Sequence, residues 1–196
     1  VLRSSDAVMP VGDVLSQESG RDERVRKAIR WLQREEMAVI REGNVTLTES
    51  GVIEGRRLLR AHRLWETYLQ HLGMPEDQLH QQAHLLEHVH DEEAVDYLDD
   101  KLGHPLQDPH GSEIPEDFVH LVPGAAVKAA LLREGHCAEV VQLDGDARLT
   151  KLQVGMTIET GPREEDGAIW TFQLPDGEVV RLDHTTADEV QVRLLA

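Results

Sequence analysis

The chain is poor in cysteine, in long apolar runs and in positive charge. Its 196 residues include a single cysteine, Cys137, which excludes an internal disulfide framework and suits a reducing cytoplasm. No apolar run approaches the roughly 20 residues that span a bilayer, and the first residues lack the pattern of a signal peptide. We therefore expect a cytoplasmic protein.

Acidic residues outnumber basic residues by 37 to 20, which gives a formal net charge of −17 at pH 7. A chain with this balance is expected to be soluble and has no overall field that attracts nucleic acid or an anionic membrane. Its length is sufficient for one large domain or two small domains, each with its own core. The sequence opens at Val1 rather than at a methionine, which suggests a fragment, an excised domain or a start upstream of Val1.

The first 50 residues have the pattern of a winged helix-turn-helix. A short helix is expected over residues 11–18 and a second over 20–37, where Val25, Ile29 and Leu32 recur at helical spacing. Two short apolar runs then flank Gly43-Asn44, a pair that favours a β-hairpin. Two helices followed by a β-wing are typical of this motif.

Three further helices and a β-rich module are expected downstream. The helices are predicted over residues 48–73, 76–90 and 91–103, and residues 103–124, with four of the eight prolines, are typical of a linker. From about residue 125, short β-rich runs alternate with Gly, Asp and Pro turns. The predicted fold class is mainly α with a C-terminal β module. The expected parts are a winged helix-turn-helix (1–50), a helical middle (51–115), a linker (116–124) and a small barrel (125–196).

The histidines are concentrated in the helical middle, where seven of the eleven lie between residues 62 and 104. His62 and Glu66 are four residues apart on one predicted helix, and His80 and His84 are four apart on the next, so each pair shares a helix face. The pattern predicts two divalent-metal sites, one of His62, Glu66 and His80 and the other of His84, Glu87 and His88.

The types of donor atom limit which metal ions the predicted sites would bind. Imidazole nitrogens and carboxylate oxygens suit Mn, Fe, Co, Ni and Zn, whereas the lack of thiolates argues against a structural zinc site. A single pair of such residues is common on a polar helix surface, but six in phase on two adjacent helices favour metal binding.

The stretch "HLLEH" (84–88) supports an enzymatic alternative. It matches the inverted zinc-protease pattern, in which two histidines bind zinc and the glutamate acts as a base. Such proteases need a third ligand downstream, where the chain offers Glu164 and Glu165 in a predicted turn. We keep a zinc hydrolase as the remote alternative.

The consecutive stretches "LTESG", "AHRLWETYL", "LHQQAHLLEHV" and "DPHGSEIP" occur in the order and spacing of a known family. Through them the chain resembles the iron- and manganese-dependent repressors of the DtxR/MntR type. The C-terminal module is similar to the SH3-like FeoA domain that many members carry. The resemblance implies that the helical middle is a metal-binding and dimerisation domain, and that Fe²⁺ or Mn²⁺ is the metal, with Zn²⁺ and Co²⁺ also compatible.

The resemblance also assigns the ligands. His62, Glu66 and His80 match the ancillary metal site of the family, and His84, Glu87 and His88 match its primary regulatory site. Position 84 is usually cysteine in iron-type members and glutamate in manganese-type members, so His84 departs from both. In iron-type members the SH3-like domain adds a Glu and a Gln to the ancillary site. Here Glu139 and Gln142 have that spacing after a shift of one residue.

The N-terminal part departs from the family pattern. The family's first helix, which supplies further primary-site ligands, is reduced to "VLRSSDA" or absent. Asp6 or water would then complete the shell of the primary site, or the missing segment lies upstream of Val1. Asp22 and Glu23 stand where phosphates would approach the recognition helix. The basic residues expected to contact phosphate are Arg21, Arg24, Arg26, Lys27 and Arg30. They are also compatible with a solvated face, since residues 1–50 hold 8 basic and 9 acidic residues.

Two functions therefore remain open. The first is a metal-activated repressor that binds a duplex DNA operator as a homodimer. The second is a cytosolic DtxR-like domain fused to a metal ABC-transporter permease, which senses metal without binding DNA. An apolar stripe of Ala94, Val95, Leu98 and Leu102 fits a dimer interface or the monomer's own core. The SH3-like module is expected to add ligands, to bind the segment 110–124, or to be a folded appendage.

Overall fold

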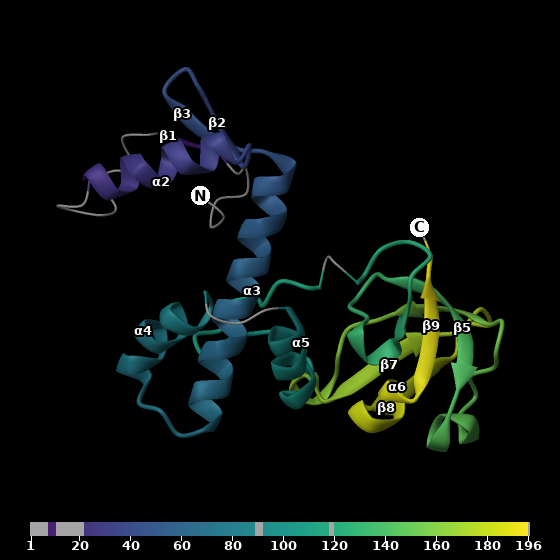
Figure 1. Cartoon of the computed structure of the whole chain (residues 1–196). Coiled ribbons are helices and arrows are strands. Elements are labelled where there is room, and N and C mark those ends of the chain that lie inside the picture. The colour runs from purple at the N-terminus through teal and green to yellow at the C-terminus, as the bar shows by residue number, and fades with distance from the viewer. Residues whose placement is uncertain (1–7, 11–21, 89–91, 118–119, 196) are drawn as a thin grey trace. The chain divides into compact units, whose positions relative to one another are not determined.

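The computed structural model describes residues 8–10, 22–88, 92–117 and 120–195 (Figure 1). Its contacts divide the chain into two compact units, Val1–Leu59 and Arg60–Ala196. The helix expected over residues 11–18 lies outside the described residues. A helical N-terminal part and a C-terminal antiparallel sheet confirm the predicted fold class.

The first unit contains helix α2 (Asp22–Arg34) and a small sheet in the order β1-β3-β2. Its strands are β1 (Val8–Pro10), β2 (Ala38–Arg41) and β3 (Asn44–Leu47). The hairpin turn lies at Glu42 and Gly43, with φ of 51° and 77°, rather than at Gly43-Asn44 as predicted. Two consecutive residues with positive φ match the twist of the flanking strands. Strand β1, which the sequence did not predict, pairs with β3.

Helix α3 (Glu49–His71) begins at a side-chain cap. The amide of Gly51 donates to Oγ1 of Thr48 at 3.1 Å, and the Thr48 hydroxyl donates to the carbonyl of Glu36 at 2.7 Å. This hydroxyl therefore satisfies an amide that the first helical turn leaves without an intrahelical partner. A Cβ added at Gly51 would lie 1.9 Å from the carbonyl oxygen of Met37, so this position requires glycine.

Three helices form the helical part of the second unit: the remainder of α3, α4 (Glu76–Leu86) and α5 (Glu92–Lys101). Helix α4 ends at Leu86, four residues before the predicted end. Val95 of α5 packs in a core cluster with Ala61, Leu64 and Ile114. This part of the predicted dimerisation stripe therefore lies in the core of its own chain.

The proline-containing segment after α5 is packed against the protein over residues 103–117. Ile114 is fully buried, and its amide donates to the carbonyl of Leu106 at 2.9 Å. The guanidinium of Arg133 donates to the carbonyl of Ile114 at 2.7 Å. Farther along, Leu121 packs against the core of the β module. The module therefore contacts the segment 110–124, one of the roles considered for it.

The β module is a six-stranded antiparallel sheet in the order β4-β9-β5-β6-β7-β8 (Figure 1). Its strands are β4 (Ala126–Lys128), β5 (Cys137–Leu143), β6 (Thr157–Thr160), β7 (Ile169–Gln173), β8 (Val179–Asp183) and β9 (Val190–Leu194). Alternate residues of β9 (Val190, Val192 and Leu194) face the core, as the two-residue period of a strand requires. The short helix α6 (His184–Asp188) connects β8 to β9.

Candidate metal centre

The histidines of helix α4 lie next to the buried apolar residues of the same helix. Leu79 and Ala83 are fully buried and lie four residues apart, so they fix one face of the helix against the protein. His80 and His84 each follow one of these two residues, and Glu87 lies four residues after Ala83. The apolar spacing of α4 therefore sets the positions of its polar ligand-type side chains.

Helix α3 supplies the opposing side chains. His62 and Glu66 lie one helical turn apart, next to the fully buried Leu64. The side chain of Glu66 is 3% exposed, and that of His62 is 12% exposed. Burying an ionised carboxylate is costly unless a positive charge or several donors compensate it. Glu66 therefore needs cationic partners from the neighbouring helix.

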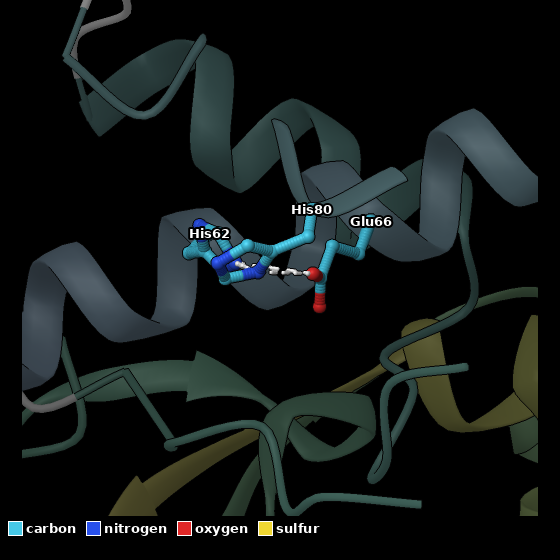
Figure 2. A group of neighbouring side chains, drawn as sticks. All are labelled: His62, Glu66 and His80. Carbon is cyan, nitrogen blue, oxygen red and sulfur yellow. Dashed lines mark hydrogen bonds and ion pairs between the residues drawn. The ribbon is translucent and has the colours of Figure 1, made fainter. Parts of the chain in front are cut away.

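The first predicted group of ligands converges in the structure (Figure 2). Nε2 of His62 lies 3.0 Å from Nδ1 of His80, and each of these nitrogens lies 3.1 Å from Oε1 of Glu66. The three atoms form a nearly equilateral triangle. Ligands bound to one cation at about 2.0–2.2 Å lie roughly 3–3.5 Å from one another, so the triangle has the size of one face of a metal coordination shell.

The second predicted group is centred on Glu87, the residue that follows α4. Its Oε1 lies 2.7 Å from Nδ1 of His84 and 3.3 Å from Nε2 of His88. Its Oε2 contacts Nδ1 of His62. His62, His84 and Glu87 each offer one ligand atom within 4.8 Å of the others. The two predicted triplets therefore form one continuous cluster, in which His62 belongs to both groups.

The side chains of this cluster are suited to binding a cation. Two nearly buried carboxylates, Glu66 and Glu87, face imidazole nitrogens that bind a proton or a metal but not both. The negative charge of the two carboxylates favours a divalent ion beside the imidazole nitrogens. The donor set contains nitrogen and oxygen atoms, which suit Mn²⁺, Fe²⁺, Co²⁺ and Zn²⁺.

His110 approaches the same cluster, although the sequence analysis assigned it no role. Its Nε2 lies 3.9 Å from Oε1 of Glu66, and its Nδ1 lies 3.8 Å from Oε1 of Glu76. The stretch "DPHGSEIP" that contains His110 was recognised as a family landmark. The position of His110 within this stretch is the feature of the sequence that could have identified it as a candidate ligand.

The two predicted ligands from the β module have partners within the module. Glu139 lies 3.4 Å from the guanidinium of Arg193, and the amide of Gln142 donates to Asp144 at 2.6 Å. Among the residues that the structure describes, Glu139 does not belong to a group of His, Cys, Asp and Glu side chains that could hold a metal. Their proposed contribution to the ancillary site would require a rearrangement of these contacts.

The predicted DNA-contacting residues lie on α2 of the first unit. Arg24, Arg26 and Lys27 are exposed, and the exposed Arg30 lies 3.2 Å from Glu23. Arg21 lies outside the described residues, as does Asp6, the residue considered for completing the primary shell. Helix α2 therefore presents a basic surface that carries its own acidic counter-charge.

Comparisons with known proteins identify the family of the chain. Residues 48–116 match the metal binding and dimerisation domain of iron-dependent repressors. Over 178 residues the chain is 31% identical to the iron-dependent repressor IdeR of Mycobacterium tuberculosis, with 80% of this chain and 76% of that protein covered. The chain therefore belongs to the family of iron- and manganese-dependent repressors of the DtxR/MntR type, as its motifs predicted.

A shorter match connects the chain to a transport protein. Over 72 residues it is 40% identical to a probable metal transport system membrane protein of Chlamydia trachomatis. The match covers 36% of this chain and 16% of that protein. In the described part of the chain, no helix combines the length and the apolar character that crossing a membrane requires.

The fold agrees with that of a solved regulator. The manganese regulator SloR aligns with a TM-score of 0.52 at 22% identity, covering 95% of this chain and 90% of that one. The alignment spans both the helical part and the β module, so the two chains share their fold over both parts.

Proposed function

We propose that the protein is a metal-dependent transcriptional repressor, active as a homodimer on a duplex DNA operator. The observation that carries this proposal is the cluster on α3 and α4, in which His62 is shared by two groups of ligand-type residues. The proposed ligands are His62, Glu66, His80, His84, Glu87 and His88, with Glu139 and Gln142 as additional candidates. We also propose the domain limits given above, with 1–50 for DNA, 51–115 for metal and dimerisation, and 125–196 as an SH3-like module.

The residues of the cluster fit a divalent cation. Three donor atoms of the His62 group lie 3.0–3.1 Å apart, and two nearly buried carboxylates compensate a double positive charge. When bound, Fe²⁺ or Mn²⁺ would supply the positive charge that balances the two carboxylates. His62 and Glu66 on one helix and His80 and His84 on the next would then hold α3 and α4 together.

Metal can regulate DNA binding only through a difference in affinity. The cation must bind the DNA-competent arrangement more tightly than the other arrangement, since equal affinities leave the equilibrium unchanged. Arg24, Arg26, Lys27 and Arg30 are the proposed phosphate contacts, together with Arg21. Their neutralisation of phosphates would make affinity fall with rising salt.

The remaining assignments follow from this role. A repressor of this kind acts in the cytoplasm and is not an enzyme. The zinc-hydrolase alternative needs Glu87 as a free base, but the Glu87 carboxylate is contacted by the imidazoles of His62, His84 and His88. These contacts favour a sensing site over a hydrolytic one.

A second candidate function is supported by the 40% identity to the probable metal transport system membrane protein. In this alternative the chain is a regulatory domain, fused to or associated with a metal-transporter membrane domain, that binds metal and does not bind DNA. The acidic residues at the start of α2 favour this alternative.

The experiment that separates the two is a selection from random duplex DNA at one near-physiological salt concentration, with and without Mn²⁺ or Fe²⁺. Metal content is measured in the same samples. The repressor predicts enrichment of a two-fold symmetric site only with metal, and loss of the enrichment in His84→Ala and His88→Ala. Bound metal without enriched DNA would support the transporter alternative, and a protein that binds no metal would refute both.

A further inference from the structure

A second group of ligand-type residues lies away from α3 and α4, where the end of α5 meets the β module. Asp100 lies in the last turn of α5, His104 follows that helix, and His184 is the first residue of α6. One ligand atom of each lies within 4.8 Å of the others. The imidazole rings of His104 and His184 have centroids 5.3 Å apart.

His104 is held in the orientation and tautomer of a metal ligand. The residue is 5% exposed, and its Nδ1 lies 2.8 Å from Oδ2 of Asp99. The same carboxylate oxygen accepts a hydrogen bond from Arg60 at 2.8 Å. Because the carboxylate of Asp99 accepts a hydrogen bond from Nδ1–H, Nε2 is the ring nitrogen of His104 that remains to bind a metal. A carboxylate bonded to the far nitrogen of an imidazole is a recurrent second layer of metal sites.

The metal-facing nitrogen of His104 lacks a hydrogen-bond partner. Its Nε2 is buried and has none among the described residues, and the same is true of Nε2 of His184. Buried polar atoms are nearly always hydrogen-bonded, so two such nitrogens on neighbouring rings point to a ligand that satisfies both. Oδ1 of Asp100 lies 3.7 Å from Nε2 of His104, close to the roughly 3–3.5 Å between ligands of one cation.

The surroundings leave room for the remaining coordination positions. The three residues line an open pocket of about 760 Å³, which is ample for water ligands. Arg163 also lines the pocket and opposes a cation, but its guanidinium stacks on Trp170 at 3.8 Å and donates to the carbonyls of His104 and Ala130. Lys101 also lines the pocket, and Asp100 together with Asp99, which pairs with Arg60, offsets part of the positive charge. Arg163 thereby also fixes the backbone of His104.

We propose that Asp100, His104 and His184 form a third divalent-metal site, separate from the α3/α4 cluster and suited to Zn²⁺, Co²⁺ or Ni²⁺. Two imidazoles and one carboxylate, with water in the open position, are a common ligand set for these borderline ions. A cation there joins the end of α5 to α6 and so ties the helical part to the β module. This inference does not depend on DNA binding or on metal at the α3/α4 cluster.

The test compares the Zn²⁺ content of the whole chain after equilibrium dialysis. His184→Gln and Asp100→Asn remove partly or fully exposed ligands and leave the buried His104 in place. Each is expected to bind one equivalent of Zn²⁺ fewer than the unmodified chain, while the control His71→Gln, at the exposed end of α3, keeps the full content. His84→Ala is expected to retain the third site.

NMR spectra of the histidine rings test whether the additional Zn²⁺ binds at His104 and His184. In ¹H–¹⁵N spectra of the histidine rings, Zn²⁺ is expected to shift the resonances of both His104 and His184 in the His84→Ala chain. The proposal is overturned if His184→Gln binds as much Zn²⁺ as the unmodified chain, or if Zn²⁺ leaves both resonances unchanged. Either result leaves the α3/α4 cluster and its proposed role untouched.

Discussion

Nδ1 of His62, on α3, contacts Oε2 of Glu87 at the end of α4, while the other ring nitrogen of His62 faces Glu66 and His80. One imidazole therefore joins two groups of ligands that the sequence alone presented as separate. We therefore expect metal occupancy of one group to depend on that of the other.

Replacement of His62 should impair both groups, whereas replacement of His80 or His84 should impair one. His62→Ala is expected to weaken both Mn²⁺ equivalents at least about tenfold, in line with the effect of disturbing ligand orientation at metal sites. Isothermal titration calorimetry at fixed pH measures this, with His71→Ala as the control. Two full-affinity equivalents in His62→Ala would contradict the shared site.

The residue at position 84 should set the metal preference. Imidazole favours Zn²⁺, whereas carboxylate favours Mn²⁺, so His84→Glu is expected to lower the ratio of Zn²⁺ to Mn²⁺ affinity. Competition titrations of both metals against one chelator give this ratio. A ratio unchanged by His84→Glu would show that His84 does not contact the metal.

Exposed basic residues of α2 should contribute to DNA affinity through phosphates. Arg24→Ala and Lys27→Ala are each expected to reduce the slope of log K against log salt by about one, without changing the preferred sequence. Fluorescence anisotropy at several salt concentrations measures the slope. Arg181→Ala, an equal loss of charge in the β module, serves as the control and should leave the slope unchanged.

Gly51 should be intolerant of any side chain. In Gly51→Ala the new methyl group meets the carbonyl oxygen of Met37 at 1.9 Å, so the start of α3 or the hairpin must shift. We expect a loss of about 1–3 kcal/mol in the free energy of unfolding, the usual cost of overpacking. Urea denaturation measures it, and Ile53→Ala, at an exposed position on the same helix, should cost less.

His120 should titrate above its usual range. Its hydrogen bond to Asp117, with the further charges of Asp117 and Asp96, raises the pKa of His120 above 6.5 although burial opposes the shift. A raised folded-state pKa means that the ion pair stabilises the fold below about pH 6.5 and loses this effect as pH rises through the folded-state value. An NMR titration should show a pKa above 6.5 for His120 and a lower one in Asp117→Asn.

The helical spacing in the sequence was sufficient to predict much of the candidate centre. His62 and Glu66, like His80 and His84, lie four residues apart, and a helix places such residues on one face whatever the rest of the fold does. The β-module strands were predicted for a similar reason, because alternation along a strand is a local property. The end of α4 and the position of the turn at Glu42 were predicted less accurately, because the ends of helices and strands depend on individual hydrogen bonds.

Contacts between distant segments were decided by the tertiary structure alone. The sequence determined the class of protein, its helical ligand pairs and the nitrogen and oxygen donors available for a metal. It did not determine that His62 reaches Glu87, that Ile114 is buried within a proline-containing segment, or that His104 and His184 converge. These relationships depend on how buried side chains such as Leu64 and Leu79 pack one helix against another, and packing of this kind has no local period in the sequence.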